Sequence, residues 1–245
     1  MSNDRLIYLP LGGAGEVGMN TYVYGYGPKN RERLIVVDLG VTFPDMDGTP
    51  GVDLIMADIA WLEARRDRIE GIFITHAHED HVGGLGHLWS RLRAPVYARD
   101  FTARIAAKKM LEAGQPVDQI VTLDASETVE LGPFQVRFLP IAHSLPEASA
   151  MLIETPAGRL VHTGDFKLDM APGVGDPFDE DLYRSIGDKG VDVMVCDSTN
   201  IFSPHPGRSE SSLPQAITEL VRGAPGLVVA TTFVTVYLVR HVIGA

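Results

Sequence analysis

One short stretch constrains this chain more than any other: residues 75–81 read Thr-His-Ala-His-Glu-Asp-His. The apolar run 71–74 precedes it, and the glycine-rich run 82–86 follows it. An apolar run bounded by glycine indicates a buried strand, so the motif lies where a strand ends and the chain turns toward a helix. Alternation along that strand would send His76 and His78 to the same side.

Such a density of nitrogen and oxygen donors predicts a divalent metal of borderline softness, with zinc first and manganese or iron next. The alternative is a polar surface turn, which the position at the end of a buried strand disfavours. An open catalytic zinc site needs three protein ligands, so a larger set indicates two ions close together. The candidate ligands of this stretch are His76, His78, Glu79, Asp80 and His81.

Length and composition place the chain among globular proteins. It has 245 residues, 45% hydrophobic and 22% charged, enough for one large domain or two small ones. No apolar run is long enough to span a bilayer and the start lacks a signal-peptide pattern, so we expect a cytoplasmic location. The single cysteine, Cys196, lies in an apolar run and is predicted to be buried. It has no partner for an internal disulfide, which fits a reducing compartment.

The net charge of −11 argues mildly against a nucleic-acid partner, because such proteins usually carry a basic face. Bound metal ions would add positive charge at the site itself. The chain is also expected to be incomplete. The net charge therefore does not exclude a nucleic-acid partner.

A second motif, residues 12–18, contains the spacing G-x-G-x-x-G, and Asp38 follows Gly18 by 20 residues. Spacing alone would indicate a dinucleotide site. That fold needs a helix directly after the glycines, whereas residues 21–28 are β-branched and aromatic and then broken by Gly and Pro. We therefore reject the dinucleotide interpretation and expect an antiparallel meander with the glycines in a tight turn at the edge of the site. Its strands are predicted near 6–11, 20–26 and 33–39.

Polar residues also follow later predicted strands. His143 follows the strand predicted at 134–141, and Asp165 follows the one at 159–163. A carboxylate in that position has two oxygens with which to bridge two metals. Asp38 ends its own strand either as a carboxylate near the metals or as a turn or helix cap, and the residues favour neither. Lys167 either faces a phosphate or is a solvated surface lysine.

The remaining pattern predicts further helices and strands. The expected helices are 54–68, 85–92, 101–113, 179–187 and 213–224. The further expected strands are 71–74, 95–98, 119–123, 128–131, 148–154, 190–195 and 227–233.

Taken together, the histidine motif, Asp38, His143 and Asp165 resemble the metallo-β-lactamase superfamily. Four segments resemble one branch of it, the ribonuclease J family of β-CASP nucleases, over residues 5–233. They are 12–20, 75–84, 162–167 and 197–200. The resemblance implies an α/β protein: an αββα sandwich of two mixed sheets flanked by helices.

The resemblance also implies two zinc ions, or manganese in their place, at the strand ends. Three imidazoles would hold one ion, a carboxylate and an imidazole the other, and a further carboxylate would bridge them. The matching positions are His76, His78 and His143 for the first ion, Asp80 and His81 for the second, Asp165 as the bridge, Asp38 as a group that orders these ligands, and Asp197 as the first acidic motif of the branch. Of these, Asp80, Asp165, Asp197 and Asp38 are the expected catalytic residues.

Residues 5–233 would form an incomplete, N-terminal part of the metallo-β-lactamase domain, reaching the start of a missing β-CASP domain. In the family that further domain supplies two later histidines, one of them a ligand of the second metal, and much of the RNA-binding surface. Residues 234–245 form an atypical tail, in which His241 lies in the wrong context to replace either histidine. We therefore expect a truncated or frame-shifted product.

The implied function is metal-dependent hydrolysis of RNA phosphodiester bonds, by 5′-to-3′ exonuclease and endonuclease action, in RNA processing, including that of ribosomal RNA, and decay. The expected partner is RNA, with no membrane, and the full-length family forms homo-oligomers. One alternative is a small-molecule hydrolase of the same superfamily, a thioesterase or lactonase, whose sequence would lack segment 197–200. The other is an inactive fragment that only binds metal or a partner subunit.

Overall fold

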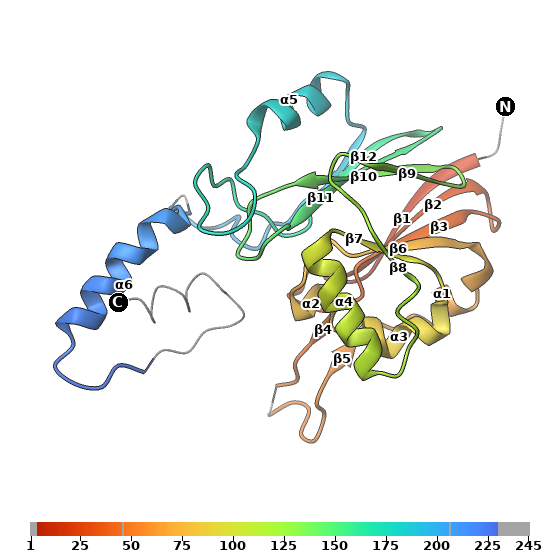
Figure 1. Cartoon of the computed structure of the whole chain (residues 1–245). Helices are drawn as coiled ribbons and strands as arrows, with labels where there is room; N and C mark the ends of the chain where they lie inside the picture. Colours follow the sequence, from red (N-terminus) through yellow and green to blue (C-terminus); the bar gives the residue numbers. More distant parts are fainter. Residues whose placement is uncertain (1–3, 46, 206, 230–245) are drawn as a thin grey trace.

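Two β-sheets lie face to face in the computed structural model, with helices on the outer side of each (Figure 1). The structure describes residues 4–45, 47–205 and 207–229. Three apolar clusters separate four layers in the order helices, sheet, sheet, helix. The expected αββα sandwich is confirmed.

The first sheet has the strand order β1-β2-β3-β6-β7-β8. Its first three strands pair antiparallel, and β3, β6, β7 and β8 run parallel. The predicted meander, with no helix after the glycines, is confirmed. The strands are β1 (Asp4–Gly12), β2 (Thr21–Pro28), β3 (Arg33–Val37), β6 (Ile69–Phe73), β7 (Val96–Ala98) and β8 (Ile120–Thr122).

The second sheet has the order β13-β12-β11-β10-β9, antiparallel except for the parallel pair β12 and β13. Both sheets are therefore mixed, as expected. The strands are β9 (Thr128–Leu131), β10 (Phe134–Pro140), β11 (Ser149–Thr155), β12 (Gly158–His162) and β13 (Val193–Val195), and a separate small sheet pairs β4 (Val41–Thr42) with β5 (Ile55–Met56).

Most helices lie over the first sheet, and α5 lies over the second (Figure 1). In α3, apolar side chains recur every three to four residues, so one face is buried against the sheet. The helix α4 stops before Gly114, whose φ of 68° ends the helix at little steric cost. The helices are α1 (Ala60–Glu63), α2 (Glu79–Val82), α3 (Leu85–Leu92), α4 (Asp100–Glu112), α5 (Glu180–Asp188) and α6 (Leu213–Gly223), with 3₁₀ turns η1 (Arg66–Arg68) and η2 (Glu210–Ser212).

Alternation along the strands distributes side chains between the apolar clusters. In β3, Val36 packs with Leu88 of α3 on the helix side, whereas Ile35 packs between the two sheets. Phe138 of the second sheet belongs to the same middle layer, and Ile186 of α5 covers the outer side of the second sheet. From Leu34 to Val37 the strand β3 is apolar and buried on both faces, so its end is held firmly where the polar residues begin.

Three expectations about local structure are wrong or only partly tested. Residues 54–68 do not form one helix, because β5 pairs with β4 and Asp58 accepts a hydrogen bond from Ala60 N (2.9 Å), so α1 begins only there. Cys196 is exposed, because β13 is an edge strand of its sheet within the described residues. Residues 227–229 form no strand, and 230–233, like the tail 234–245, lie outside the described residues. Among the described helices, none combines the length and apolar character needed to cross a membrane.

Candidate metal centre

The histidine motif begins in the loop between β6 and α2 and ends within that helix. The strand ends at Phe73, so His76 and His78 meet through a loop and not through strand alternation as predicted. Their rings approach with His76 Nε2 3.0 Å from His78 Nδ1. His78 is the extended residue that precedes α2, and His81 lies in that helix. One turn of helix therefore points a third imidazole at the same region.

Four residues form what we call the three-histidine cluster: His76, His78, His143 and Asp165. Each offers one ligand atom, and these atoms lie within 4.8 Å of one another. His143, from the loop after β10, places Nε2 3.2 Å from His78 Nδ1 and 3.9 Å from Asp165 Oδ2. Asp165 follows β12, so loops from both sheets supply this cluster.

Asp80, His81 and Asp165 form a second group, the aspartate cluster, with ligand atoms again within 4.8 Å of one another. His81 Nε2 lies 3.6 Å from Asp80 Oδ2 and 3.3 Å from Asp165 Oδ1. The two oxygens of Asp165 thus face different clusters, Oδ1 toward His81 and Oδ2 toward His143. The structure brings together all six predicted metal ligands, with Asp165 common to both groups.

Asp38, which is fully buried, holds this arrangement from behind. Its Oδ1 accepts a hydrogen bond from Thr75 N (2.8 Å), and its Oδ2 accepts from Thr75 Oγ1 (2.8 Å) and from His81 Nδ1 (2.7 Å). A histidine that donates through Nδ1 presents Nε2 to a ligand. The sequence left two interpretations of Asp38 open, a carboxylate near the metals or a turn or helix cap. The structure places the Asp38 carboxylate beside the predicted ligands.

Thr75 extends the same control to His76. Its hydroxyl gives its one hydrogen to the Asp38 carboxylate, so it can only accept from His76 Nδ1, 3.1 Å away. The His76 Nε2 lone pair then faces the three-histidine cluster.

Burial and neighbouring charges set the protonation of these groups. Burial, helped by His81, His143 and His78, lowers the pKa of His76 well below its usual value. Burial also lowers the pKa of His143 to about 4, so both rings are neutral near pH 7.

Where carboxylates lie beside the imidazole of His81, the charged forms of both groups are favoured instead. Burial alone would raise the pKa of Asp165, but the hydrogen bond and charge of His81 lower it to about 2. Burial disfavours a charged His81, yet Asp38 and Asp165 outweigh burial and raise its pKa. Divalent ions bind neutral imidazoles and ionised carboxylates, so an ion on His81 would displace one of its protons, and these residues fit a metal.

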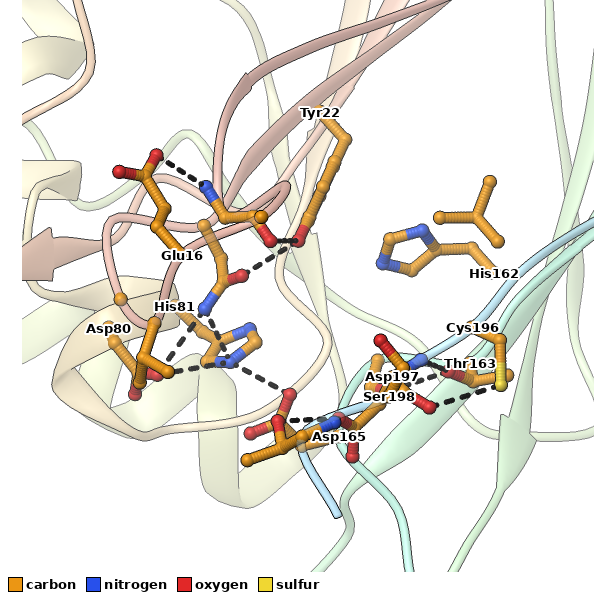
Figure 2. Close-up of a pocket in the computed structure, with 18 of the residues that line it drawn as sticks. Glu16, Tyr22, Asp80, His81, His162, Thr163, Asp165, Cys196, Asp197 and Ser198 are labelled. Carbon is orange, nitrogen blue, oxygen red and sulfur yellow. Dashed lines mark hydrogen bonds and ion pairs between the residues drawn. The ribbon is translucent and has the colours of Figure 1, made fainter. Parts of the chain in front are cut away.

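A cavity of about 480 Å³ opens over the aspartate cluster (Figure 2). The glycine loop lines one side, and Asp197, which follows β13, lines the other. Asp197 N donates to Thr163 Oγ1 (2.9 Å), and its Oδ1 accepts from Thr199 N and Oγ1 (2.8 and 2.7 Å). Asp197 belongs to neither cluster, and its catalytic role stays a prediction. Lys167 lies outside this lining and near Asp169, with Nζ 3.7 Å from Oδ2.

Sequence reasoning gave no role to four residues that touch this centre: Thr75, Asn20, Tyr22 and His162. Tyr22 and His162 line the cavity, and Asn20 contacts Asp80 and His81. The one available signal was that three of them lie within or beside the quoted motifs.

A comparison with known protein families agrees with this candidate metal centre. Residues 14–215 match the model of the metallo-beta-lactamase superfamily. The chain belongs to this superfamily. The superfamily match and the two donor clusters together support a hydrolase.

Among curated proteins the chain is similar to "Ribonuclease J" of Sinorhizobium meliloti, with 43% identity over 94% of this chain and 41% of that protein. It is also similar to "Ribonuclease J" of Corynebacterium glutamicum (38% identity, 100% and 33%) and of Helicobacter pylori (36%, 91% and 32%). The chain therefore spans between 32% and 41% of the length of these relatives.

Among solved structures, a protein of unknown function from Enterococcus faecalis superposes with a TM-score of 0.56 and 17% identity. The match covers 90% of this chain and 58% of that one. This likeness shows the fold alone.

Proposed function

We propose that this superfamily member is the N-terminal catalytic part of a metal-dependent ribonuclease that uses two divalent ions, zinc first and manganese second. The observation that carries the proposal is the sharing of Asp165 by two donor clusters, of which the aspartate cluster lines a cavity. The similarity to ribonuclease J proteins over most of the chain supports RNA as the substrate.

The three-histidine cluster would hold one ion and the aspartate cluster the other. Such ions supply Lewis acidity toward water and toward the phosphate oxygens of a substrate. The chain's own residues orient the donors: Asp38 fixes His81 and, through Thr75, His76. Asp197 has its Oδ1 held by Thr199, and we assign its other oxygen to hydrogen bonding or proton exchange with the substrate.

The finer parts of the proposal rest on the resemblance and on the names of the relatives. They are 5′-to-3′ exonuclease and endonuclease action, a role in RNA processing and decay, a cytoplasmic location and assembly into homo-oligomers. Residues 5–233 would be joined in the whole protein to a β-CASP domain that completes the RNA-binding surface.

The test compares substrates on one preparation. The zinc- or manganese-loaded chain is incubated with 5′-monophosphorylated RNA and, in parallel, with a thioester and a lactone. We expect RNA cleavage that stops when the metal is removed by a chelator. Turnover of the thioester or lactone without RNA cleavage would identify a small-molecule hydrolase instead. Metal binding without turnover of any substrate would identify an inactive fragment.

A further inference from the structure

The glycine motif has no role among the metal ligands, yet it lies against the cavity. Gly13 has a φ of 78°, and a Cβ there would lie 2.2 Å from Asn20 Oδ1 and 2.4 Å from Tyr22 OH. Both distances are far below a van der Waals contact, so only glycine fits beside this pair of side chains. The loop therefore fits closely around Asn20 and Tyr22.

Asn20 is buried and faces the aspartate cluster with its amide nitrogen. Nδ2 lies 3.3 Å from Asp80 Oδ2 and 3.0 Å from His81 Nε2. Its Oδ1 accepts a hydrogen bond of 2.7 Å from Tyr22 OH. A reversed amide would place Oδ1 against the Asp80 carboxylate, so the observed orientation is the favourable one.

The backbone ties the same two residues together. Asn20 N donates to Asp80 O (2.9 Å), and Gly40 N donates to Asn20 O (2.9 Å). A Cβ on Gly40 would lie 1.6 Å from Asp80 O, so glycine is required at this crossing as well. Asn20 and Asp80 are therefore fixed to each other through both backbone and side chain.

Tyr22 is itself held in place. Its ring lies 4.9 Å from the ring of His162 and stacks on that of Tyr8 at 6.2 Å, measured between ring centroids. His162 is anchored in turn, because its Nδ1 lies 2.9 Å from Tyr24 OH. The Tyr22 hydroxyl thus has a fixed position from which to aim the Asn20 amide.

We propose that Asn20, aimed by Tyr22, is a positioning residue that presents Asp80 and His81 to the second metal ion. With an ion on His81 Nε2, the Asn20 amide would hold Asp80 alone. The glycine motif serves this arrangement by leaving room for the two side chains. The inference rests on the proposed two-metal centre and deepens it.

The test is a calorimetric titration of the metal-free chain with Zn²⁺, repeated with Mn²⁺, for the wild type, Asn20→Ala and Tyr22→Phe. We expect two binding events in the wild type. Asn20→Ala should weaken one event by about 10- to 100-fold, the range found when groups that orient metal ligands are removed. Tyr22→Phe loses one neutral hydrogen bond, so a smaller change of about 2- to 10-fold is expected. The other event, from the three-histidine cluster, should be unchanged in both variants.

Tyr26→Phe is the matched control, because it removes a hydroxyl from the same strand, and both events should stay as in the wild type. Circular dichroism and the melting temperature of each metal-free variant report folding. If Asn20→Ala fails to fold, Tyr22→Phe decides. Unchanged affinities, equal weakening of both events, unfolding of both variants, or fewer than two ions in the wild type would each overturn the inference.

The outcomes separate this inference from the proposed function. If the variants weaken the binding of one ion only, in a chain that cleaves no RNA, the positioning role stands and the ribonuclease is rejected. RNA cleavage by a chain whose metal affinities do not change in Asn20→Ala would keep the ribonuclease and reject the positioning role.

Discussion

The two donor clusters share Asp165 but are held in different ways. In the three-histidine cluster, the imidazoles of His76, His78 and His143 contact one another directly. In the aspartate cluster, the donors take their orientation from Asp38 and Asn20, which belong to neither cluster. The three-histidine cluster is therefore held mainly by contacts among its own ligands, with one link from Asp38 through Thr75 to His76, whereas the aspartate cluster depends directly on groups behind it.

The clusters also differ in access. The side chains of Asp80 and Asp165 are 32% and 33% exposed, whereas that of His81 is 2% exposed. The cavity lies over the aspartate cluster, and the imidazoles of the first cluster do not line it. A substrate phosphate would therefore approach from the side of the cluster that depends on outside support.

Removing an imidazole of the three-histidine cluster should have the greatest consequence. His76→Ala or His78→Ala deletes a ligand of an ion that contributes several kcal/mol, so RNA hydrolysis should fall by about a thousandfold or more. His87→Ala, on the exposed side of α3, is the matched control and should keep full activity. A His76→Ala protein with normal metal content and normal cleavage rate would show that the site is misassigned.

Removing one ligand from the aspartate cluster alone should distinguish the two metal sites, because only one ion should be lost. Asp80→Asn should reduce bound zinc from two ions per chain to one, as counted by elemental analysis after dialysis. Asp197→Asn should keep both ions, because Asp197 lies outside both clusters, while hydrolysis falls. Equal metal content in wild type and Asp80→Asn would remove Asp80 from the ligands.

A substitution of Asp38 tests the hydrogen bonds that orient the ligands from behind. Asp38→Asn replaces one buried acceptor with a donor, so either the Thr75 or the His81 hydrogen bond is lost. We expect the affinity of the aspartate cluster to fall by about 10- to 100-fold. We also expect the metal-free chain to lose about 1–3 kcal/mol of stability, the cost of an unsatisfied buried group. Urea unfolding and metal titration measure the two effects, and a change in stability alone would limit Asp38 to a structural role.

The histidine motif, His143 and Asp165 could be found from the sequence because each follows a recognisable apolar strand. Asn20 and Asp80 are 60 residues apart and His162 and Tyr24 are 138 apart, so neither pairing follows from local spacing. The helix expected at 54–68 failed because pairing of β5 with β4 outweighs helical periodicity. Cys196 was misplaced because an apolar run does not reveal whether its strand lies at a sheet edge.

A smaller effect concerns His162, whose ring packs beside that of Tyr22, and the pH dependence of stability. Burial lowers the pKa of His162 to about 4, so the unfolded chain binds this proton near pH 6.5 and the folded chain does not. Stability should therefore fall as the pH drops from 7 to 5, with about 2 kcal/mol of the loss due to His162. Urea unfolding of metal-free His162→Gln should show a loss smaller by that amount, and an identical pH profile would contradict this origin.

Native mass spectrometry of the zinc-loaded chain tests whether Asp165 joins two metal sites. We predict two ions in the wild type, one in Asp80→Asn, and weakened binding of both ions in Asp165→Ala. A wild type that binds a single ion, or an Asp165→Ala protein that retains two ions with unchanged affinity, would contradict a shared two-metal centre.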